Sequence, residues 1–117
     1  MASISIILRK PPYGTTDASE AVRHSLGAIT EDMAVNLILL DGGVATAKKD
    51  QNTDSTEYLN MESGIVDCLD MGAEVYADEM SIIEAGLKIK DLIEGVRISN
   101  SREIAGIILN SDTTMIF

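Results

Sequence analysis

Short apolar runs alternate along this chain with longer segments in which apolar residues recur at helical intervals. The first run, residues 3–8, is too continuously apolar for an edge strand with one wet face, and it predicts a buried strand. Similar runs at 35–40 and 74–77 predict two more strands. A short segment at 97–98 and a final run at 113–117 complete a set of four or five strands.

Helices are predicted between these strands. Asp17 and Glu20 stand at the spacing of a capping box, Asn60 is expected to cap a later helix, and Asn100 with Glu103 forms another capping pair. Residues 50–57 are polar and without period, which predicts a loop. The expected helices are 16–30, 44–49, 60–71, a short one that ends at Gly86, and a last one from Asn100 through Leu109.

Alternating strands and helices indicate a parallel sheet covered on both faces, because parallel neighbours need crossover connections and these are usually helices. The sequence therefore predicts an α/β fold, a three-layer sandwich with a mainly parallel sheet of four or five strands, similar to the flavodoxin type. At 117 residues the chain fits a single domain over 1–117.

Nine basic and nineteen acidic residues give a formal net charge of −10. This charge repels phosphate backbones and anionic lipids, so we expect neither a nucleic acid nor a membrane partner. A solvated acidic face is the ordinary interpretation, and docking onto a basic surface of another protein is the alternative. The longest apolar runs are about a strand in length, far short of the roughly 20 residues that span a bilayer.

The chain has one cysteine, which cannot form an intramolecular disulfide, and we expect a cytoplasmic, reduced setting without a secretory signal. Cys68 follows Ile65 by three residues on the apolar face of a predicted helix, where a free cysteine behaves as a small hydrophobe with a raised pKa. His24 follows Glu20 by four residues and has no second histidine with which to share a metal. We expect a surface role for it.

The segment from Glu74 to Leu87 passes from a predicted strand directly into a predicted helix. In open parallel sheets, ligands gather just past the carboxyl ends of the strands, where helix amides also point. Asp78 at this position is expected to cap the helix with its carboxylate. The alternative is that Asp78 and Glu79 bind a cation or act as an acid and base pair, although carboxylates at a helix start are common.

The loops after the first two predicted strands belong to the same edge of the sheet. Tyr13, Gly14 and Thr15 follow the first strand in a proline-shaped turn, which lacks the glycines and lysine of a phosphate loop. Asp41 and Gly43 follow the second, where glycine permits close approach of the backbone to something else, such as a neighbouring subunit. The candidate pocket comprises Tyr13, Gly14, Thr15, Asp41, Gly43, Asp78, Glu79 and Ser81, with no catalytic residue, metal or cofactor expected.

Four short motifs in this order carry a family resemblance over the whole chain. They are Pro12-Tyr13-Gly14-Thr15, Asp41-Gly42-Gly43-Val44, Tyr76-Ala77-Asp78 followed by Gly86-Leu87, and the closing run Asp112 to Phe117. Together they resemble the DsrE/DsrF/TusD family of small sulfur-relay proteins. The resemblance implies this fold and assembly into trimers or hexamers. It also implies a persulfide-carrying cysteine at the position of Asp78, and in some relatives at Ser81, and both cysteines are absent here.

Two functions remain open at this point. The first is a DsrE/DsrF-like protein that forms a homo-oligomer and acts as a non-catalytic binding or scaffold member, with other sulfur-relay proteins as candidate partners. The second is a small-ligand or nucleotide-binding protein, or an enzyme, that uses Tyr13, Asp41 and Asp78 in a pocket at the carboxyl ends of the strands. No Ser-His-Asp motif, metal cluster or phosphate loop supports the second hypothesis.

Overall fold

The computed structural model describes residues 1–117 and contains one sheet of five strands, all of them parallel. The predicted α/β sandwich is therefore confirmed. The order β4-β3-β2-β1-β5 places β2 at the centre, whereas flavodoxin has its second strand at an edge. The strands are β1 (Ser3–Leu8), β2 (Ala34–Leu39), β3 (Glu74–Asp78), β4 (Arg97–Ser99) and β5 (Thr113–Ile116).

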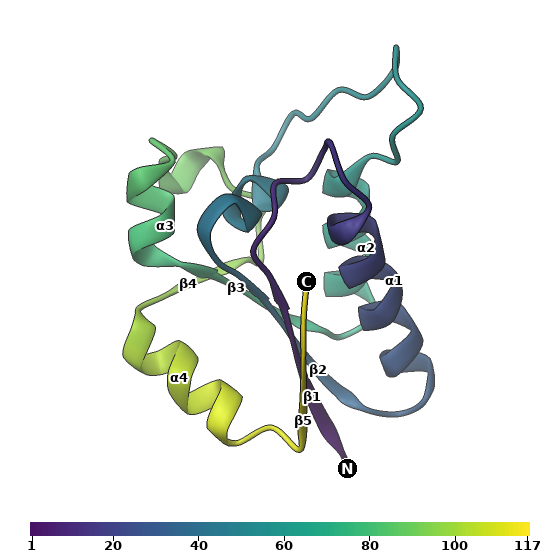
Figure 1. The fold of residues 1–117 in the computed structure, drawn as a ribbon, viewed down its shortest axis with the longest axis vertical. Helices are drawn as coiled ribbons and strands as arrows, with labels where there is room; N and C mark the ends of the chain where they lie inside the picture. The colour runs from purple at the N-terminus through teal and green to yellow at the C-terminus, as the bar shows by residue number, and fades with distance from the viewer.

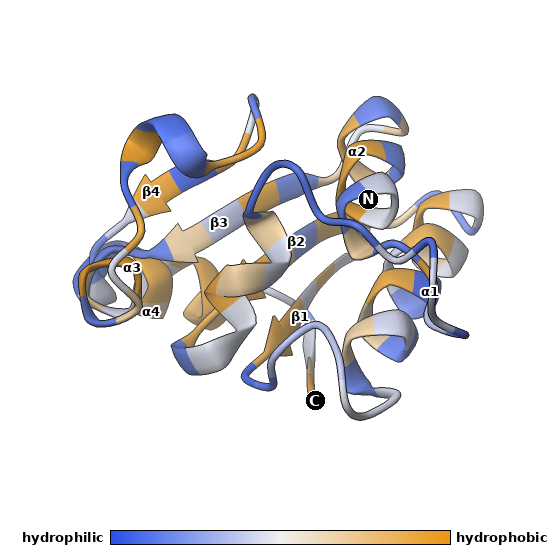
Figure 2. Cartoon of the chain, turned by 90° about the horizontal axis from the view of Figure 1, so that it is seen from above, coloured by the Kyte–Doolittle hydropathy of each residue, from blue (hydrophilic) through white to orange (hydrophobic).

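The helices form the two outer layers. The first two α-helices cover one face of the sheet and the last covers the other (Figure 1), while a short α-helix follows the carboxyl end of β3 (Figure 2). None of these helices is both long and apolar enough to cross a membrane. The helices are α1 (Asp17–Thr30), α2 (Met61–Asp70), α3 (Glu79–Glu84) and α4 (Ser101–Leu109), with two 3₁₀ helices, η1 (Asp41–Ala47) and η2 (Ile89–Asp91).

Three of the four predicted caps are confirmed, at α2, α3 and α4. The Asn60 side chain accepts a hydrogen bond from the Ser63 backbone N–H at 3.1 Å. At α4, the Asn100 side chain accepts from the Glu103 N–H at 2.9 Å, and the Glu103 carboxylate accepts from the Asn100 N–H at 3.1 Å. Such caps satisfy N–H groups that the first helical turn leaves without a partner.

The predicted capping box at the start of α1 is wrong. Asp17 is the first helical residue, and Thr16 occupies the cap position without a side-chain bond. Glu20 pairs with Arg23 one turn later, with 2.5 Å between Arg23 Nη2 and Glu20 Oε2. Its carboxylate is therefore engaged by a guanidinium, which is a stronger partner than a backbone N–H.

A short helix is present where one was predicted over residues 44–49, but its bounds and type differ. The segment forms η1, a 3₁₀ helix that begins earlier, at Asp41, and ends at Ala47. Glycines at 42 and 43 disfavour an α-helix because of their backbone entropy, and the segment must follow the surface of β1 closely. The tighter 3₁₀ turn is the form that short connectors commonly take.

The main core lies between the sheet and the α1–α2 layer and is almost wholly aliphatic. A smaller cluster on the opposite face contains Ile7, Ile38 and Ile104 of α4. Ile116 pairs in register with Ile7 and so faces the same side, but its side chain is 66% exposed. The nine residues of α4 thus leave the β5 edge of this face uncovered.

Residues 50–60 form no helix or strand, as predicted for 50–57, and project from one end of the molecule (Figure 1). Gln51 holds the base of this loop. Its side-chain amide donates to the carbonyls of Thr46 and Lys48, both at 2.9 Å, and its side-chain oxygen accepts from the Tyr13 hydroxyl. The Gln51 carbonyl accepts from the Asn60 side chain at 3.0 Å, which joins the two ends of the loop.

Candidate functional site

The strand-to-helix junction is built as the sequence predicted. Val75 and Ala77 of β3 are buried, and Asp78 is both the last residue of β3 and the N-cap of α3. Asp78 Oδ2 accepts a hydrogen bond from the Ser81 backbone N–H at 3.1 Å. The predicted capping role of Asp78 is therefore confirmed, and the helix start needs no ligand to satisfy this N–H group.

Ser81 connects this junction to the loop after β2. Its buried hydroxyl donates to Asp78 Oδ2 at 2.7 Å and accepts from the Asp41 backbone N–H at 2.9 Å. The same carboxylate oxygen thus receives two hydrogen bonds, and the serine oxygen is engaged as donor and acceptor. The structure brings Asp41, Asp78 and Ser81 together, while Glu79, the first residue of α3, is exposed.

Arg9 adds a positive charge that the sequence analysis did not select. Its Nε lies 3.6 Å from Asp41 Oδ2, with both side chains largely exposed. An exposed pair of this kind contributes between about 0 and 1 kcal/mol to stability. Arg9 follows β1 directly, so the parallel alignment of β1 and β2 is what brings it to Asp41.

Gly43 approaches the backbone of its own chain. A Cβ atom built on Gly43 would lie 2.1 Å from the backbone oxygen of Leu8 at the end of β1. The positive φ in this turn belongs to Asp41, at 50°, and not to either glycine. Aspartate tolerates this left-handed conformation better than most residues. Gly43 is therefore required for close packing of η1 beneath β1.

Two hollows flank the Asp41–Asp78–Ser81 cluster. The first has a volume of about 290 Å³ and places Asp41 and Asp78 opposite the first two turns of α4. The second, of about 260 Å³, lies on the α3 side and is lined by Asp41, Gly42, Ser81, Glu84 and Ala85. The α4 wall was missed by the sequence analysis, because nothing local links β3 to that helix. The first hollow is lined by Leu40, Asp41, Asp78, Ser101, Ile104, Ala105 and Ile108.

The loop after β1 does not line either hollow beside the Asp41–Asp78–Ser81 cluster. Gly14 and Thr15 line a third hollow, of about 330 Å³, together with the 57–61 segment and the start of α1. The Tyr13 hydroxyl bonds to Gln51 and to the Met61 N–H, and its ring lies 5.6 Å from that of Tyr58. Neither hollow beside Asp78 includes Tyr13, Gly14 or Thr15. The predicted pocket is thus divided between two parts of the molecule.

The titratable groups around Ser81 are the carboxylates of Asp41, Asp78 and Glu84. Ser81 bonds to a carboxylate without an intervening histidine, whereas serine nucleophiles need an adjacent general base. His24 lies on α1, half-buried, with Nδ1 2.8 Å from the Glu20 carbonyl oxygen and its ring 5.3 Å from that of Phe117. No group of three His, Cys, Asp or Glu side chains is arranged to hold a metal ion.

Cys68 is fully buried on the inner face of α2, as its helical spacing predicted. Burial, assisted by the charge of Asp67, raises the pKa of the thiol to about 11. Since the thiolate is the nucleophilic form, Cys68 is unreactive at neutral pH. Its role is to fill the core.

Comparison with known sequences agrees with the fold and the motifs. A sequence model of the DsrE/DsrF-like family matches residues 2–117. The chain belongs to the DsrE/DsrF-like family. It is similar to the uncharacterized protein MJ0989 of Methanocaldococcus jannaschii, with 32% identity over 114 residues that cover 97% of each chain. It shares the same identity over 115 residues with the uncharacterized protein MK0008 of Methanopyrus kandleri, covering 97% of this chain and 93% of the relative.

Solved structures show the same fold. The YchN protein of E. coli superimposes with a TM-score of 0.91 over the full length of both chains, at 21% identity. MTH1491 of Methanobacterium thermoautotrophicum, a protein of unknown function, gives a TM-score of 0.71 over 97% of each chain, at 12% identity. At these identities the two structures support the architecture alone.

Proposed function

We propose that this DsrE/DsrF-like protein is a non-catalytic binding or scaffold member of its family, acting as a homo-oligomer in the cytoplasm. Other sulfur-relay proteins are its candidate partners. The resemblance implies that the sulfur-relay members carry a persulfide on a cysteine at the position of Asp78. A carboxylate cannot carry a persulfide, so this chain would bind within a relay without passing sulfur itself.

The observation that carries this proposal is the state of Asp78. Its Oδ2 accepts two hydrogen bonds from Ser81, so the carboxylate has a complete structural role at the start of α3. The thiol of Cys68 is buried and has a pKa of about 11, so it does not replace the missing cysteine. The chain therefore retains the family fold without an available thiolate.

The uncovered edge of the sheet supports assembly. β5 is an edge strand, and exposed edges tend to pair with another chain or to be covered by one. Ile116 on this strand is 66% exposed, and Leu109, the last residue of α4, is 84% exposed. We infer a trimer or hexamer whose subunit contacts cover this region.

Two measurements test the proposal. Treatment of the native protein with a persulfide donor should leave its mass unchanged, since Cys68 is buried; stable gain of a sulfur atom on Cys68 would contradict the non-catalytic role. Light scattering coupled to sizing should give a trimer or hexamer. A monomer at tens of micromolar would refute the assembly, and Ile116→Asp should shift the oligomer toward smaller species.

The 290 Å³ hollow beside Asp78 supports a second function, which is binding of a small ligand. Its apolar wall, including Ile104 and Ile108 of α4, faces the carboxylates of Asp41 and Asp78. Such a surface favours a ligand with an apolar part and a hydrogen-bond donor or a cation, and it repels the phosphates of a nucleotide. Native mass spectrometry of freshly purified protein would reveal a retained ligand. Asp78→Asn should then weaken its binding by removing the charge.

A further inference from the structure

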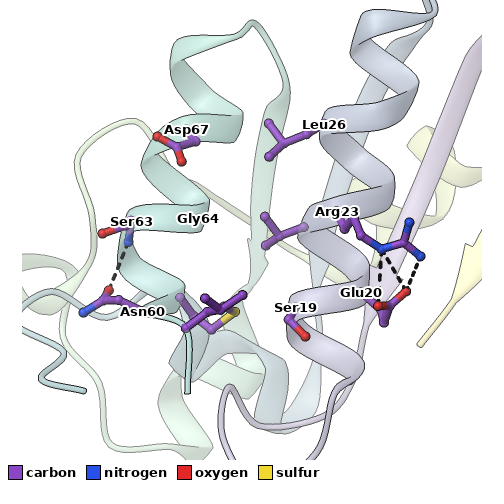
Figure 3. Close-up of a pocket in the computed structure, with 11 residues that line it drawn as sticks. Ser19, Glu20, Arg23, Leu26, Asn60, Ser63, Gly64 and Asp67 are labelled. Atoms are coloured by element: carbon purple, nitrogen blue, oxygen red, sulfur yellow. Dashed lines mark hydrogen bonds and ion pairs between the residues drawn. The ribbon is translucent and has the colours of Figure 1, made fainter. Parts of the chain in front are cut away.

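The largest of the four hollows lies between α1 and α2, on the face of the molecule away from the sheet (Figure 3). It is an open groove of about 460 Å³ whose lining is mainly apolar. We call it the α1–α2 groove, and it does not include Asp41, Asp78 or Ser81. The groove is lined by Ser19, Glu20, Val22, Arg23, Leu26, Leu59, Asn60, Met61, Ser63, Gly64 and Asp67.

A glycine lets α1 and α2 approach each other closely at the groove. Gly64 of α2 faces Val22 of α1, and a Cβ atom on Gly64 would lie 3.2 Å from Val22 Cγ1. Leu26 extends from α1 toward α2 further along the groove (Figure 3). At the other end Leu59 is 71% exposed, just before the Asn60 cap. An apolar floor therefore continues into an exposed apolar side chain at the rim.

The charges along one side of the groove are unbalanced. Helix α2 contains three acidic residues, Glu62, Asp67 and Asp70, and no lysine, arginine or histidine. On α2, Asp67 is exposed, and its carboxylate forms neither a hydrogen bond nor an ion pair. The one basic side chain that lines the groove is Arg23. It is already hydrogen-bonded to Glu20 and lowers the pKa of that carboxyl. The α2 rim thus presents uncompensated negative charge beside apolar surface.

We propose that the α1–α2 groove docks a basic amphipathic helix of a partner protein. Amphipathic helices bind such grooves by placing apolar residues spaced three and four apart along the floor. In this arrangement the apolar side chains of the partner contact Val22, Leu26 and Leu59. Its lysines or arginines lie against the α2 rim at Asp67. The ten residues of α2 offer about 15 Å of length, enough for about three turns of a bound helix.

Charge favours a different protein over a second copy of this chain. The copy would carry the same net charge of −10, and no helix of this chain contains more than one lysine or arginine. The three that occur are Arg23 in α1, Lys90 in η2 and Arg102 in α4. A helix from this chain therefore cannot supply the row of positive charges that matches the α2 rim. The docking site is also separate from Asp78, and it stands whether or not that cluster binds a ligand.

The test uses synthetic helical peptides with a fluorescent label, titrated against the full chain. The probe places leucines at helical spacing on one face and lysines on the other, over about four turns. One control peptide has the same composition in scrambled order, and the other has glutamate in place of lysine. We expect saturable binding of the basic amphipathic probe, and weaker binding of both controls. Equal binding of the scrambled peptide would overturn the proposal, because only net charge would then matter.

Two matched double variants locate the site. Leu59→Ser with Asp67→Asn removes one exposed apolar residue and one exposed charge from the rim, and should weaken probe binding by about tenfold or more. Ile89→Ser with Glu94→Gln makes the same changes on exposed residues outside the groove and should leave affinity within about twofold. Equal losses in both variants would place the probe elsewhere. A change in oligomeric state confined to the first variant would show that the groove is a subunit contact, and would also overturn the proposal.

A charge exchange supplies an independent check. Asp67→Lys should bind the glutamate peptide better than the native chain does, and the lysine peptide less well, because the sign of the rim charge is reversed. Asp67 is exposed and unpaired, so this change is compatible with folding. Unchanged preference for the lysine peptide would exclude Asp67 from the binding surface and contradict the proposal.

Discussion

The Ser81 hydroxyl donates a hydrogen bond of 2.7 Å to Asp78 Oδ2, on the same oxygen that caps the backbone of α3. This bond fixes the orientation of the serine so that its oxygen accepts from the Asp41 N–H on the neighbouring loop. Two connections at the carboxyl edge of the sheet are thereby held together by one side chain. The polar residues of the candidate site thus stabilise the fold as well.

Replacing Asp78 separates its capping role from its charge. Asp78→Ala should lower the free energy of unfolding by about 1 to 2 kcal/mol, because the Ser81 N–H and hydroxyl lose their acceptor. Asp78→Asn should recover most of this loss, since the amide oxygen also caps. Urea unfolding of the three proteins measures the difference. An asparagine variant as unstable as the alanine variant would show that the carboxylate charge itself is needed.

Gly43 should be among the least replaceable residues of the chain. A Cβ atom on Gly43 would lie 2.1 Å from the Leu8 backbone oxygen, so Gly43→Ala must displace backbone and should cost several kcal/mol. Gly27→Ala is the matched control, because a Cβ there meets nothing within 4 Å and alanine favours helix α1 by about 1 kcal/mol. Thermal unfolding should show Gly43→Ala well below the native protein and Gly27→Ala at or above it.

Local sequence signals were enough to predict most of the fold. The continuous apolar run of β1, the Asn100 and Glu103 pair and the spacing around Cys68 each report on contacts within one element. The 3₁₀ form of η1 was not predictable in this way. It depends on the approach of Gly43 to Leu8, which only the paired strands bring together.

In the candidate site, too, contacts within one element could be predicted from the sequence, and contacts between distant segments could not. Asp78 and Ser81 are three residues apart, so their bond follows from helix geometry. Arg9 reaches Asp41 through strand pairing. The direction of Tyr13 is set by its bond to Gln51, in a loop whose course no pattern in residues 50–57 specifies. Shared position at one edge of a sheet therefore did not imply a shared pocket.

Gln51 should control the order of the loop that it anchors. Gln51→Ala removes two donated bonds to backbone carbonyls and the acceptor of the Tyr13 hydroxyl, and should destabilise the protein by about 1 to 3 kcal/mol. Residues 52–59 should then be cleaved faster by proteases under native conditions. Asn52→Ala is the control, because that exposed side chain accepts only from the Asp54 N–H. Equal cleavage of both variants would refute the anchoring role.

Cys68 should make stability depend on pH in the alkaline range. Its pKa rises on folding from an ordinary value of 9.0 to about 11, so the folded state keeps the proton to higher pH than the unfolded state. The contribution of the protonated Cys68 thiol to the free energy of unfolding is complete below about pH 9, and it is lost as the pH rises through about 11. Cys68→Ala should remove this component, although the smaller side chain lowers stability at all pH values. The two unfolding curves against pH should converge above pH 9; parallel curves would contradict the raised pKa.

Restoring a cysteine at Asp78 tests the resemblance on which the proposed function depends. In an Asp78→Cys chain that also carries Cys68→Ala, the thiolate would lie where the Ser81 N–H and hydroxyl now donate to Asp78. Donors at a helix start stabilise a thiolate and lower its pKa, so alkylation near neutral pH should be faster than in the unfolded protein. Glu94→Cys in the same background provides an exposed cysteine away from the site. A persulfide donor should also add one sulfur atom to the Asp78→Cys chain and leave the Glu94→Cys chain unmodified or less modified.

Reaction of Asp78→Cys no faster than the unfolded control would mean that this junction is not the sulfur pocket of the family. The position assigned to the missing cysteine would then be wrong, and the absence of a thiol at Asp78 would no longer support a non-catalytic role.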